Sequence, residues 1–426
     1  MEKQGKDWMD IARYFYWSKK QLYQFSQDFG HALEEALQGR PSSLQAEKSY
    51  LPLPSGNEQG TYLALDFGGT NIRVSRIRLT GNHGFMVEKM ISRPLRQEGV
   101  YDLTTPDTTA DELFDYIASL VGQAAGGNRP FYLGHTFSFG VAQEHVQDGR
   151  LLQWSKEIAV SGADGQLVND LLRRALVRRG LDQIQPAALL NDTTALLLAA
   201  AYQHGCSHVA VICGTGFNIC YYEPALQMVI ILEAGDYKGM ERTQWDVAVD
   251  EASQQPGYHQ LEKMVSGAYL CKIYEQTVKS YLGTAVPSFS TVDMNRIVGN
   301  ENCRSARMMA AQLWRQIVAP EDLQQLRSIG ASIFVRSAQL TGAACFGVLR
   351  HLYGSQDIPV QTLAIEGSVL EHVRGSLFIL EDALQDCYEE ERSGTTERIA
   401  VSSSLVKDGP SIGAAIAAAI AARQQA

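Results

Sequence analysis

The chain has 426 residues, of which 45% are hydrophobic and 20% charged, and its formal net charge is −10. This length exceeds one ordinary hydrophobic core, so two domains are expected, and the composition is that of a globular protein. The acidic balance argues against a nucleic-acid or anionic-membrane partner, because either would need a basic face. The negative net charge does not exclude a phosphate-bearing substrate, since loop amides and one or two cations can bind phosphate locally.

Cysteine usage and the first residues of the chain bear on its location. The seven cysteines are odd in number, no pair has the C-x-x-C spacing, and most lie in apolar runs, which predicts reduced, buried thiols. The first seven residues lack the apolar core of a signal peptide. The longest apolar run, 412–422, is about half of the ~20 residues that a membrane span needs. We therefore expect a cytoplasmic protein without a membrane anchor, either a monomer or a homodimer.

The first half of the chain alternates between strand and helix signals. In chain order, the spacing of apolar residues and the Gly/Pro positions predict a helix over 7–38, a break at Pro41-Ser42-Ser43, a loop over 49–60, a strand meander over 62–92, a helix over 110–124, a strand over 131–139, a helix over 164–180, a strand over 186–190 and a helix over 193–202.

The second half begins at about His208 and is richer in helices. It is predicted to contain a strand over 209–212, a strand over 218–222, a strand over 228–233, a helix over 260–282, a polar segment over 283–292, further helices, a long helix over 328–353, a strand over 363–365 and an Ala-rich helix after Asp408-Gly409-Pro410.

Two short glycine loops, Asp66-Phe67-Gly68-Gly69-Thr70-Asn71 and Gly214-Thr215-Gly216, each lie between two predicted strands. Glycine permits positive φ and lets a backbone N–H approach an anion, and the threonine hydroxyl adds a donor. Either loop alone fits an ordinary β-hairpin turn. Two of them, each opening a stretch of strands and helices, suggest a duplicated nucleotide-binding architecture with ATP in the cleft between the halves.

Asp192 follows an apolar strand and opens a helix. Helix N-capping alone would explain an aspartate here, because Asp is among the best capping residues. The functional alternative is a general base at a strand end, where open α/β sheets bind their ligands. Asn191 beside it could then fix the substrate hydroxyl that gives up its proton.

Other polar side chains also have two interpretations. Lys156 is either a solvated lysine or a ligand contact, and Glu233 is either a loop residue or a contact at the end of an apolar strand. Glu262 lies in the first turn of a helix, where the dipole favours carboxylates, and turn geometry alone would explain Asn218. The sequence has no Walker-type phosphate loop, zinc-spaced His/Cys cluster or Gly-x-Ser-x-Gly elbow.

In combination, these motifs resemble those of the hexokinases, the eukaryotic-type sugar kinases of the actin-like ATPase superfamily. The resemblance runs in family order from about residue 50 to the end. It is carried by 65–74 and 214–218 (two phosphate motifs), 133–139 and Trp154-Ser155-Lys156 (sugar loops), Leu190-Asn191-Asp192-Thr193 (catalytic aspartate), 232–235 and 256–264 (sugar contacts), Gly367-Ser368 (adenosine motif) and Asp408-Gly409 before the last helix.

The resemblance implies an α/β, two-domain actin-like ATPase (ribonuclease H-like) fold, duplicated, whose small and large domains surround a cleft and close on a sugar. The implied small domain comprises 58–191 plus 409–426, and the large domain comprises 192–408. Residues 1–57 would form an N-terminal helix and linker packed on the large domain.

The implied activity is ATP-dependent phosphorylation of a hexose, with D-glucose expected, at its 6-hydroxyl. By resemblance, Asp192 is the base, and Lys156 and Arg73 offset charge on the transferred phosphoryl group. The implied substrate contacts are Ser138, Ser155, Lys156, Asn191, Asp192, Asn218, Glu233, His259 and Glu262. The implied nucleotide contacts are Asp66, Gly68, Gly69, Thr70, Asn71, Gly214, Thr215, Gly216, Gly367 and Ser368, with Asp66 holding Mg²⁺ through water.

The chain departs from the family pattern at a cluster of positions. These are Gly140 for proline, Ser155 for threonine, Phe217 for serine, Ala234 for tryptophan, Gln255 for asparagine, His259 for a sugar-contacting glutamine, Glu366 for aspartate, and Pro410 and Ile412 in place of residues of the family's Ser-Gly-Lys stretch. They suggest an altered sugar preference or a weaker glucose affinity. Phe217, Glu366 and Pro410 also leave open a hexokinase-like sugar sensor without turnover. An actin-like filament former is a third alternative, but a filament would not need the carboxylates of a sugar pocket.

Overall fold

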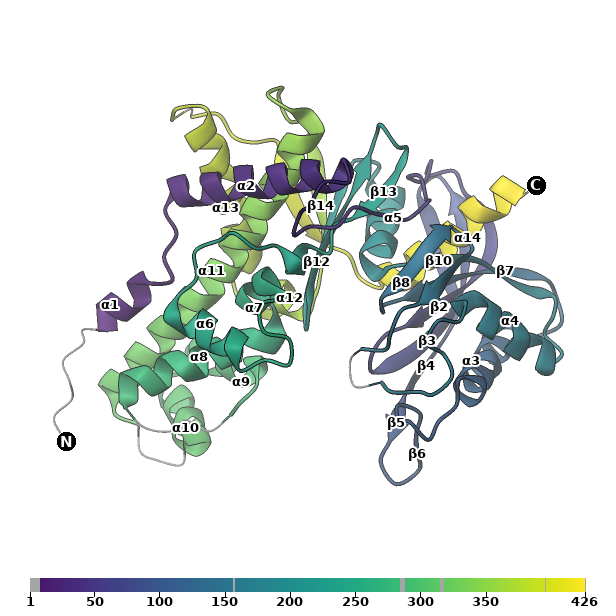
Figure 1. Ribbon diagram of the computed structural model, residues 1–426, viewed down its shortest axis with the longest axis horizontal. Coiled ribbons are helices and arrows are strands. Elements are labelled where there is room, and N and C mark those ends of the chain that lie inside the picture. The colour runs from purple at the N-terminus through teal and green to yellow at the C-terminus, as the bar shows by residue number, and fades with distance from the viewer. Residues whose placement is uncertain (1–7, 156–157, 284–287, 315–317, 395, 426) are drawn as a thin grey trace. The chain divides into compact units, whose positions relative to one another are not determined.

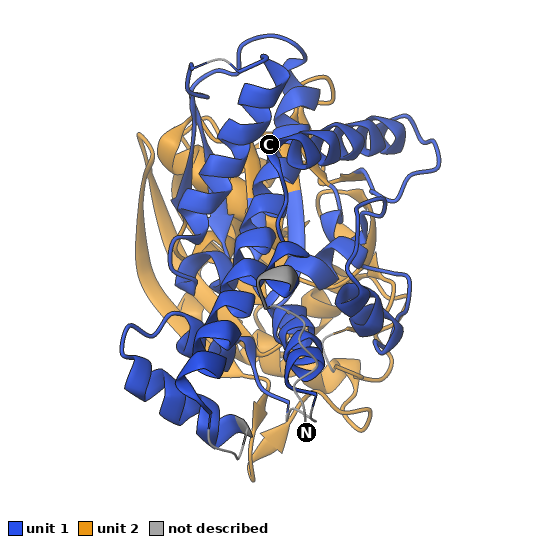
Figure 2. Ribbon diagram, turned by 90° about the vertical axis from the view of Figure 1, so that its left-hand side faces the viewer, with its two compact units in different colours: residues 1–46, 211–219, 232–405 blue, residues 47–210, 220–231, 406–426 orange. Residues whose placement is uncertain are grey.

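A computed structural model of the protein describes residues 8–155, 158–283, 288–314, 318–394 and 396–425. The chain forms two compact units, coloured separately in Figure 2. Unit 1 comprises 1–46, 211–219 and 232–405, and unit 2 comprises 47–210, 220–231 and 406–426. This division differs from the expected one, because residues 47–57, 192–210, 220–231 and 406–408 all group with unit 2.

Unit 2 is built on a five-stranded sheet with the order β10-β7-β2-β3-β4 (Figure 1). Its strands are β2 (Gln59–Phe67), β3 (Asn71–Gly81), β4 (Gly84–Pro94), β7 (Phe131–Phe137) and β10 (Ile184–Leu190). Strands β2, β3 and β4 form the predicted antiparallel meander, whereas β7 and β10 continue from β2 in parallel. The carboxyl ends of β2, β7 and β10 therefore lie at one edge of the sheet.

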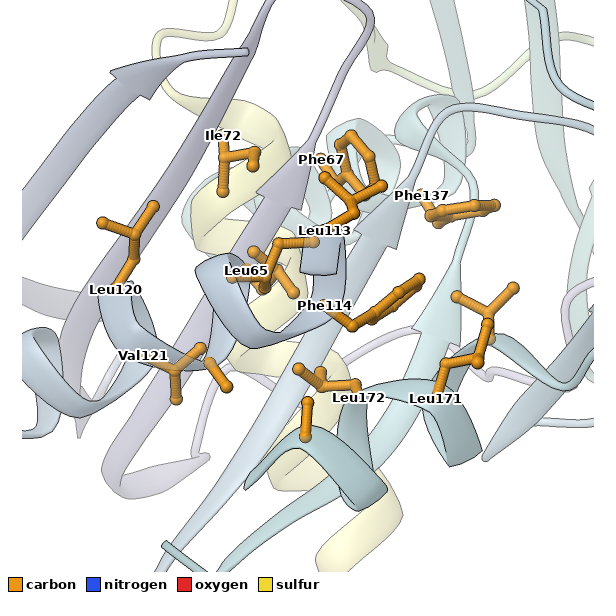
Figure 3. Close-up of a cluster of buried hydrophobic side chains, with 14 of the residues drawn as sticks. Leu65, Phe67, Ile72, Leu113, Phe114, Leu120, Val121, Phe137, Leu171 and Leu172 are labelled. Carbon is orange, nitrogen blue, oxygen red and sulfur yellow. The ribbon is translucent and has the colours of Figure 1, made fainter. Parts of the chain in front are cut away.

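The core of unit 2 lies between this sheet and helices α3 (Ala110–Ala125) and α4 (Val168–Arg178). Figure 3 shows its centre, where Leu65 and Phe67 of β2 lie among side chains of both helices. The capping box of Thr109 and Glu112 starts α3 at the predicted position. Burying so many apolar side chains against one sheet face fixes the strands that carry the site.

The other face of the sheet is covered by α5 (Asp192–His204) and α14 (Gly409–Gln425). Neighbouring residues of a strand point to opposite faces, and Gly134 follows the core residue Leu133. A Cβ on Gly134 would lie 1.9 Å from the carbonyl oxygen of Ala414, and one on Gly413 would lie 1.9 Å from that of Ala195. Glycine is thus required at both positions for α14 to approach the sheet and α5.

A second sheet has six strands in the order β1-β13-β12-β11-β14-β15. They are β1 (Glu47–Lys48), β11 (Val209–Cys213), β12 (Phe217–Glu223), β13 (Met228–Ile231), β14 (Gln361–Glu366) and β15 (Val401–Leu405). Two short pairs, which the sequence patterns do not predict, are β5 (Arg96–Gln97) with β6 (Tyr101–Asp102), and β8 (Val141–His145) with β9 (Asp148–Leu151).

Unit 1 is mainly helical. Its helices are α1 (Trp8–Arg13), α2 (Lys19–Leu37), η1 (Ala234–Asp236), α6 (Gln244–Glu251), α7 (Gln260–Val265), α8 (Gly267–Leu282), α9 (Thr291–Val298), α10 (Cys303–Trp314), α11 (Pro320–Tyr353), α12 (Ser368–His372) and α13 (Ser376–Glu391). Helix α11 packs against α2, α8 and α13. It is long and apolar enough to cross a membrane, but 83% of its most apolar window is buried, as in a core helix.

Two predicted helices are each divided in the structure. The helix expected over 7–38 is interrupted after Arg13, because Ser18 forms a capping box with Gln21 and starts α2 anew. The helix expected over 260–282 is interrupted at the extended residue Ser266. There, the N–H of Gly267 donates to the carbonyl oxygen of Gly214, 2.7 Å away, so the break connects α8 to the second glycine loop.

All seven cysteines are free thiols. Five of them are buried, Cys206 is partly exposed and Cys303 is exposed. Burial therefore accounts for most of the thiols, as their apolar surroundings in the sequence predict.

Candidate active site

The first glycine loop connects β2 to β3 in unit 2, as the sequence predicts. The N–H of Gly68 donates to the carbonyl oxygen of Asn71, 3.3 Å away. The N–H of Leu95 donates to the carbonyl oxygen of Thr70, 2.9 Å away. Both contacts are made by backbone groups at the base of the turn. They hold the loop while Thr70 and Asn71 remain exposed.

Asp66, near the end of β2, is opposite Arg73 on β3 and Thr136 on β7. The guanidinium Nη1 of Arg73 lies 3.9 Å from Oδ2 of Asp66 and 3.5 Å from Oδ1 of Asp408. Arg73 is therefore held between two carboxylates. Asp408 was not among the predicted site residues, although Asp408-Gly409 was one of the motifs that matched the family pattern.

The two sugar loops of unit 2 follow β7 and β9. The N–H of Ser138 donates to the carbonyl oxygen of Phe67, which places Ser138 beside the first glycine loop. Trp154 packs against Phe137 and Phe139, and its indole N–H donates to the carbonyl oxygen of Val160 over 2.9 Å. Trp154 thus anchors the segment that carries the exposed Ser155. The predicted catalytic residue Lys156 lies outside the described residues.

Asn191 and Asp192 lie where β10 meets α5. Asn191 is the N-cap, because its Oδ1 accepts a hydrogen bond from the N–H of Thr193 over 2.8 Å. Capping by Asp192 is therefore not needed to explain the helix start. Leu190 of β10 pairs with Thr136 of β7, and Thr136 pairs with Asp66 of β2. Asp192, two residues after Leu190, therefore lies at the same edge of the sheet as Asp66.

In unit 1, Asn218 on β12 and Glu233 after β13 form one hydrogen-bonded pair. The amide Nδ2 of Asn218 donates to Oε1 of Glu233 over 2.8 Å, while its Oδ1 accepts from the N–H groups of Ile219 and Ala234. The orientation of the Asn218 amide is thereby fixed. Glu233 itself has φ 45° and ψ 51°, a left-handed conformation that costs energy for a non-glycine residue and that this pair of hydrogen-bonded side chains helps to hold.

Glu262 on α7 lies against the second glycine loop. Its Oε2 accepts a hydrogen bond from the N–H of Phe217 over 3.0 Å. A Cβ on Gly216 would lie 2.9 Å from that oxygen, and a Cβ on Gly235 would lie 3.0 Å from the Cβ of Glu262. The two glycines therefore make the space that Glu262 occupies.

The predicted adenosine motif meets the same loop. Gly367 has φ 113°, and a Cβ there would lie 2.4 Å from the carbonyl carbon of Cys213. Only glycine permits this approach, which brings Gly367 and Ser368 to the backbone of Gly214. The nucleotide contacts predicted at 214–216 and 367–368 are thus neighbours within unit 1.

His259 precedes α7 in a left-handed conformation, with φ 52°. Its Nδ1 lies 2.5 Å from Oδ1 of Asp236, and its Nε2 lies 2.9 Å from Oε1 of Gln255. The contact with Asp236 raises the pKa of His259 above its ordinary value, against the opposing effect of burial. Burial acts to raise the pKa of Asp236, but His259 and a hydrogen bond from Gln45 hold it below its usual range.

Each unit thus brings its own predicted residues together. Unit 2 places Asp66, Arg73, Ser138, Asn191 and Asp192 at one sheet edge, and unit 1 gathers Asn218, Glu233, His259 and Glu262 with the second glycine loop. Sequence reasoning missed Asp236 and Asp408. Asp236 lies three residues after Glu233 and Asp408 lies directly before the last helix, but neither position indicates the partner from which the residue takes its role.

Comparison with known proteins identifies the family of this chain. Hexokinase family models match residues 7–202 and 208–420. The chain is 31% identical over 414 residues to Hexokinase-5 of Oryza sativa subsp. japonica, covering 86% of this chain and 79% of that protein. It is 28% identical over 447 residues to Hexokinase-1 of Schizosaccharomyces pombe, covering 95% and 88% of the two chains.

Solved structures agree. A crystal structure of a hexokinase is similar with a TM-score of 0.84 and 27% identity, over 97% of this chain and 99% of that one. The hexokinase from Schistosoma mansoni, solved in complex with glucose, has a TM-score of 0.78 and 25% identity, over 97% and 98%. These similarities confirm the predicted two-domain, duplicated actin-like ATPase fold. The chain belongs to the hexokinase family of sugar-phosphorylating enzymes.

Proposed function

We propose that this chain transfers the γ-phosphoryl group of ATP to the 6-hydroxyl of a hexose, with D-glucose the expected substrate. The observation that carries the proposal is the carboxylate–amide set of unit 1, in which Asn218, Glu233 and Glu262 are held by hydrogen bonds. Fixed carboxylates accept hydrogen bonds from sugar hydroxyls, and a substrate that lacks a matching hydroxyl leaves them unpaired. The glucose complex of the Schistosoma mansoni hexokinase supports the choice of sugar.

The chemistry assigns a role to the sheet edge of unit 2. The carboxylate of Asp192 accepts the proton of the 6-hydroxyl as that oxygen bonds to the γ-phosphorus, and ADP leaves with the electrons of the broken P–O bond. A positioned base contributes roughly 10²–10⁴-fold. Holding the hydroxyl in line with the phosphorus can remove roughly 7–11 kcal/mol of the barrier. Positioning is therefore the larger effect, with Arg73 and Lys156 offsetting the phosphoryl charge.

Mg²⁺ fits the residues beside the first glycine loop. This ion keeps several water ligands and usually takes only one or two carboxylates from a protein. Among the described residues no group of three or more His, Cys, Asp and Glu side chains could hold a metal. Asp66, a partly buried carboxylate two residues before Gly68, suits the contact through water that we propose. The ion would neutralise charge on the β- and γ-phosphates.

We also propose that sugar binding drives closure of the two units on the substrates. Water is an abundant rival nucleophile, and a site completed only by the sugar would avoid wasting ATP. The proposal is supported by the distribution of the predicted residues over both units. It also accounts for sugar contacts and the catalytic base being carried by different parts of the chain.

A coupled assay of ADP formation tests the proposal, using glucose, mannose, fructose and glucosamine with ATP-Mg. We expect turnover with glucose, and a loss of at least 10²-fold in kcat for Asp192→Ala with sugar binding retained. Binding of hexose without ADP formation by the unmodified protein would reject the enzyme in favour of a sugar sensor. A strict and tight glucose preference would reject the altered selectivity suggested by Phe217, Ala234 and His259.

A further inference from the structure

The turn over 255–259 in unit 1 is held by an unusual set of contacts around His259. This residue is in the left-handed region, which non-glycine residues seldom adopt, and it lies three residues before Glu262. Its two ring nitrogens contact Oδ1 of Asp236 at 2.5 Å and Oε1 of Gln255 at 2.9 Å. The imidazole therefore connects η1 to the turn that leads into α7.

Both partners of the ring are hydrogen-bond acceptors. A neutral imidazole has one N–H and one lone pair, whereas the imidazolium has two N–H groups. In this arrangement the imidazolium is favoured, because one ring nitrogen lies at ion-pair distance from the Asp236 carboxylate while the other faces the Gln255 side-chain carbonyl. The raised pKa of His259 agrees with this geometry.

The charged groups around His259 leave the ring as the adjustable contact of the turn. Asp236 on η1 and Glu262 favour the imidazolium, and Lys263 opposes it. Lys263 is itself engaged, because its Nζ lies 2.6 Å from Oδ1 of Asp250 and donates to the carbonyl oxygen of Gln255 over 2.7 Å. Gln255 is thus held through its backbone by a buried lysine and through its side chain by a histidine whose pKa is raised by the neighbouring Asp236 carboxylate.

We propose that His259, as an imidazolium, is a positioning residue that makes sugar affinity depend on pH, because it fixes the turn from which Glu262 reaches the sugar site. This inference rests on the proposed function and deepens it. With both ring nitrogens engaged inside unit 1, His259 acts through Glu262 and not by direct donation to the sugar. The ion pair with Asp236 and the hydrogen bond with Gln255 are both made when the pH is below the raised pKa of His259.

Deprotonation has a definite direction of effect. As the pH rises through the pKa of His259, the ring loses its positive charge and with it the ion pair to the Asp236 carboxylate. The turn then loses its charge-assisted contact with η1, while the bonds made by Gly257 and Lys263 remain, so the segment leading to Glu262 is loosened. We expect the KM for the sugar to increase by up to about tenfold, the effect of one charge-assisted contact. The kcat should change little through this group, because His259 does not touch the reacting atoms.

The test measures KM and kcat for glucose at saturating ATP-Mg from pH 5.5 to 9, for the wild-type chain, His259→Gln and Asp236→Asn. In the wild type, KM should rise with pH. His259→Gln should remove the rise, and Asp236→Asn should move it to lower pH, because the carboxylate no longer favours the charged ring. His31→Gln is the matched control, since His31 also faces a carboxylate, that of Glu35, but lies exposed on α2. Its profile should match the wild type.

An unchanged rise of KM in His259→Gln would overturn the inference, as would a pH effect confined to kcat. Direct titration of the imidazole by NMR, assigned by its loss in His259→Gln, separates this outcome from failure of the proposed function. If no hexose is phosphorylated, the proposed function fails, and the titration alone decides. A titration midpoint of His259 above pH ~6.5 in the wild type, lowered in Asp236→Asn, supports the proposed role of the imidazolium. A midpoint at or below pH ~6.5 in the wild type rejects it.

Discussion

The substitution Gly216→Ala tests whether the space beside the second glycine loop sets sugar affinity. Gly216 lies outside the left-handed region, so alanine fits its backbone, but the new Cβ would lie 2.9 Å from Oε2 of Glu262. Ordinary contacts begin near 3.4 Å, so the carboxylate has to move by about 0.5 Å. That shift is enough to stretch its 3.0 Å bond with the N–H of Phe217 beyond hydrogen-bonding distance.

The expected loss follows from the bond that the displaced carboxylate can no longer offer to the sugar. A hydrogen bond to a charged group contributes about 1.5–3 kcal/mol, which corresponds to a roughly 10–100-fold weaker sugar Kd. Loss of the bond to the N–H of Phe217 should also lower Tm, by roughly 3–12 °C. Titration calorimetry with glucose in the absence of ATP measures the Kd, and thermal unfolding measures Tm.

Gly122→Ala is the matched control. Its Cβ would also lie 2.9 Å from the end of a flexible side chain, Cδ1 of Leu181, but in α3 of unit 2. Sugar affinity should be unchanged in this variant. An unchanged Kd in Gly216→Ala, or an equal loss in Gly122→Ala, would refute the reasoning.

Two further predictions concern stability. Asp246→Ala removes the partner of the buried Arg336, whose Nη1 and Nη2 each lie 2.7 Å from that carboxylate. The unpaired charge should cost about 3–5 kcal/mol, seen as a Tm lower by roughly 6–20 °C, and the double variant Asp246→Leu with Arg336→Met should recover most of it; no recovery would contradict the assignment. Burial lowers the pKa of His135 to about 4, so the folded protein excludes a proton that the unfolded chain binds below pH ~6.5. Unfolding free energy should therefore fall by about 3 kcal/mol through this group as the pH drops from 7 to 4, and urea titrations should show a smaller fall in His135→Gln.

Much of the fold could be predicted because local patterns and packing agree. The capping box of Thr109 and Glu112 begins α3 where periodicity predicts a helix, and the glycines at 68 and 69 turn β2 into β3. The divided helices were missed for a physical reason. Ser266 lies within a continuous apolar pattern, and what interrupts the helix is a backbone contact between Gly267 and Gly214, which are distant in sequence.

The candidate site shows the same limit. The polar residues at strand ends, such as Asp192 and Glu233, could be found because a strand pattern ends directly before them. Asp236 and Asp408 could not, since their importance comes from the partners His259 and Arg73, which other parts of the chain supply. A sequence pattern identifies the residue that begins or ends an element, whereas ion pairs between elements become visible only in three dimensions.

Helix α14 has a consequence for how the protein is made. The hydroxyl of Thr136 donates to the carbonyl oxygen of Pro410, 274 positions later, and the backbone of Ala414 packs closely against Gly134. A ribosome adds roughly 5–20 residues per second, so α14 is made on the order of tens of seconds after Thr136. Until then, the strands of unit 2 lack this helix on their second face. Throughout that interval the emerging chain leaves uncovered the part of this sheet face on which α14 packs, so unit 2 can complete its fold only when that helix has been made.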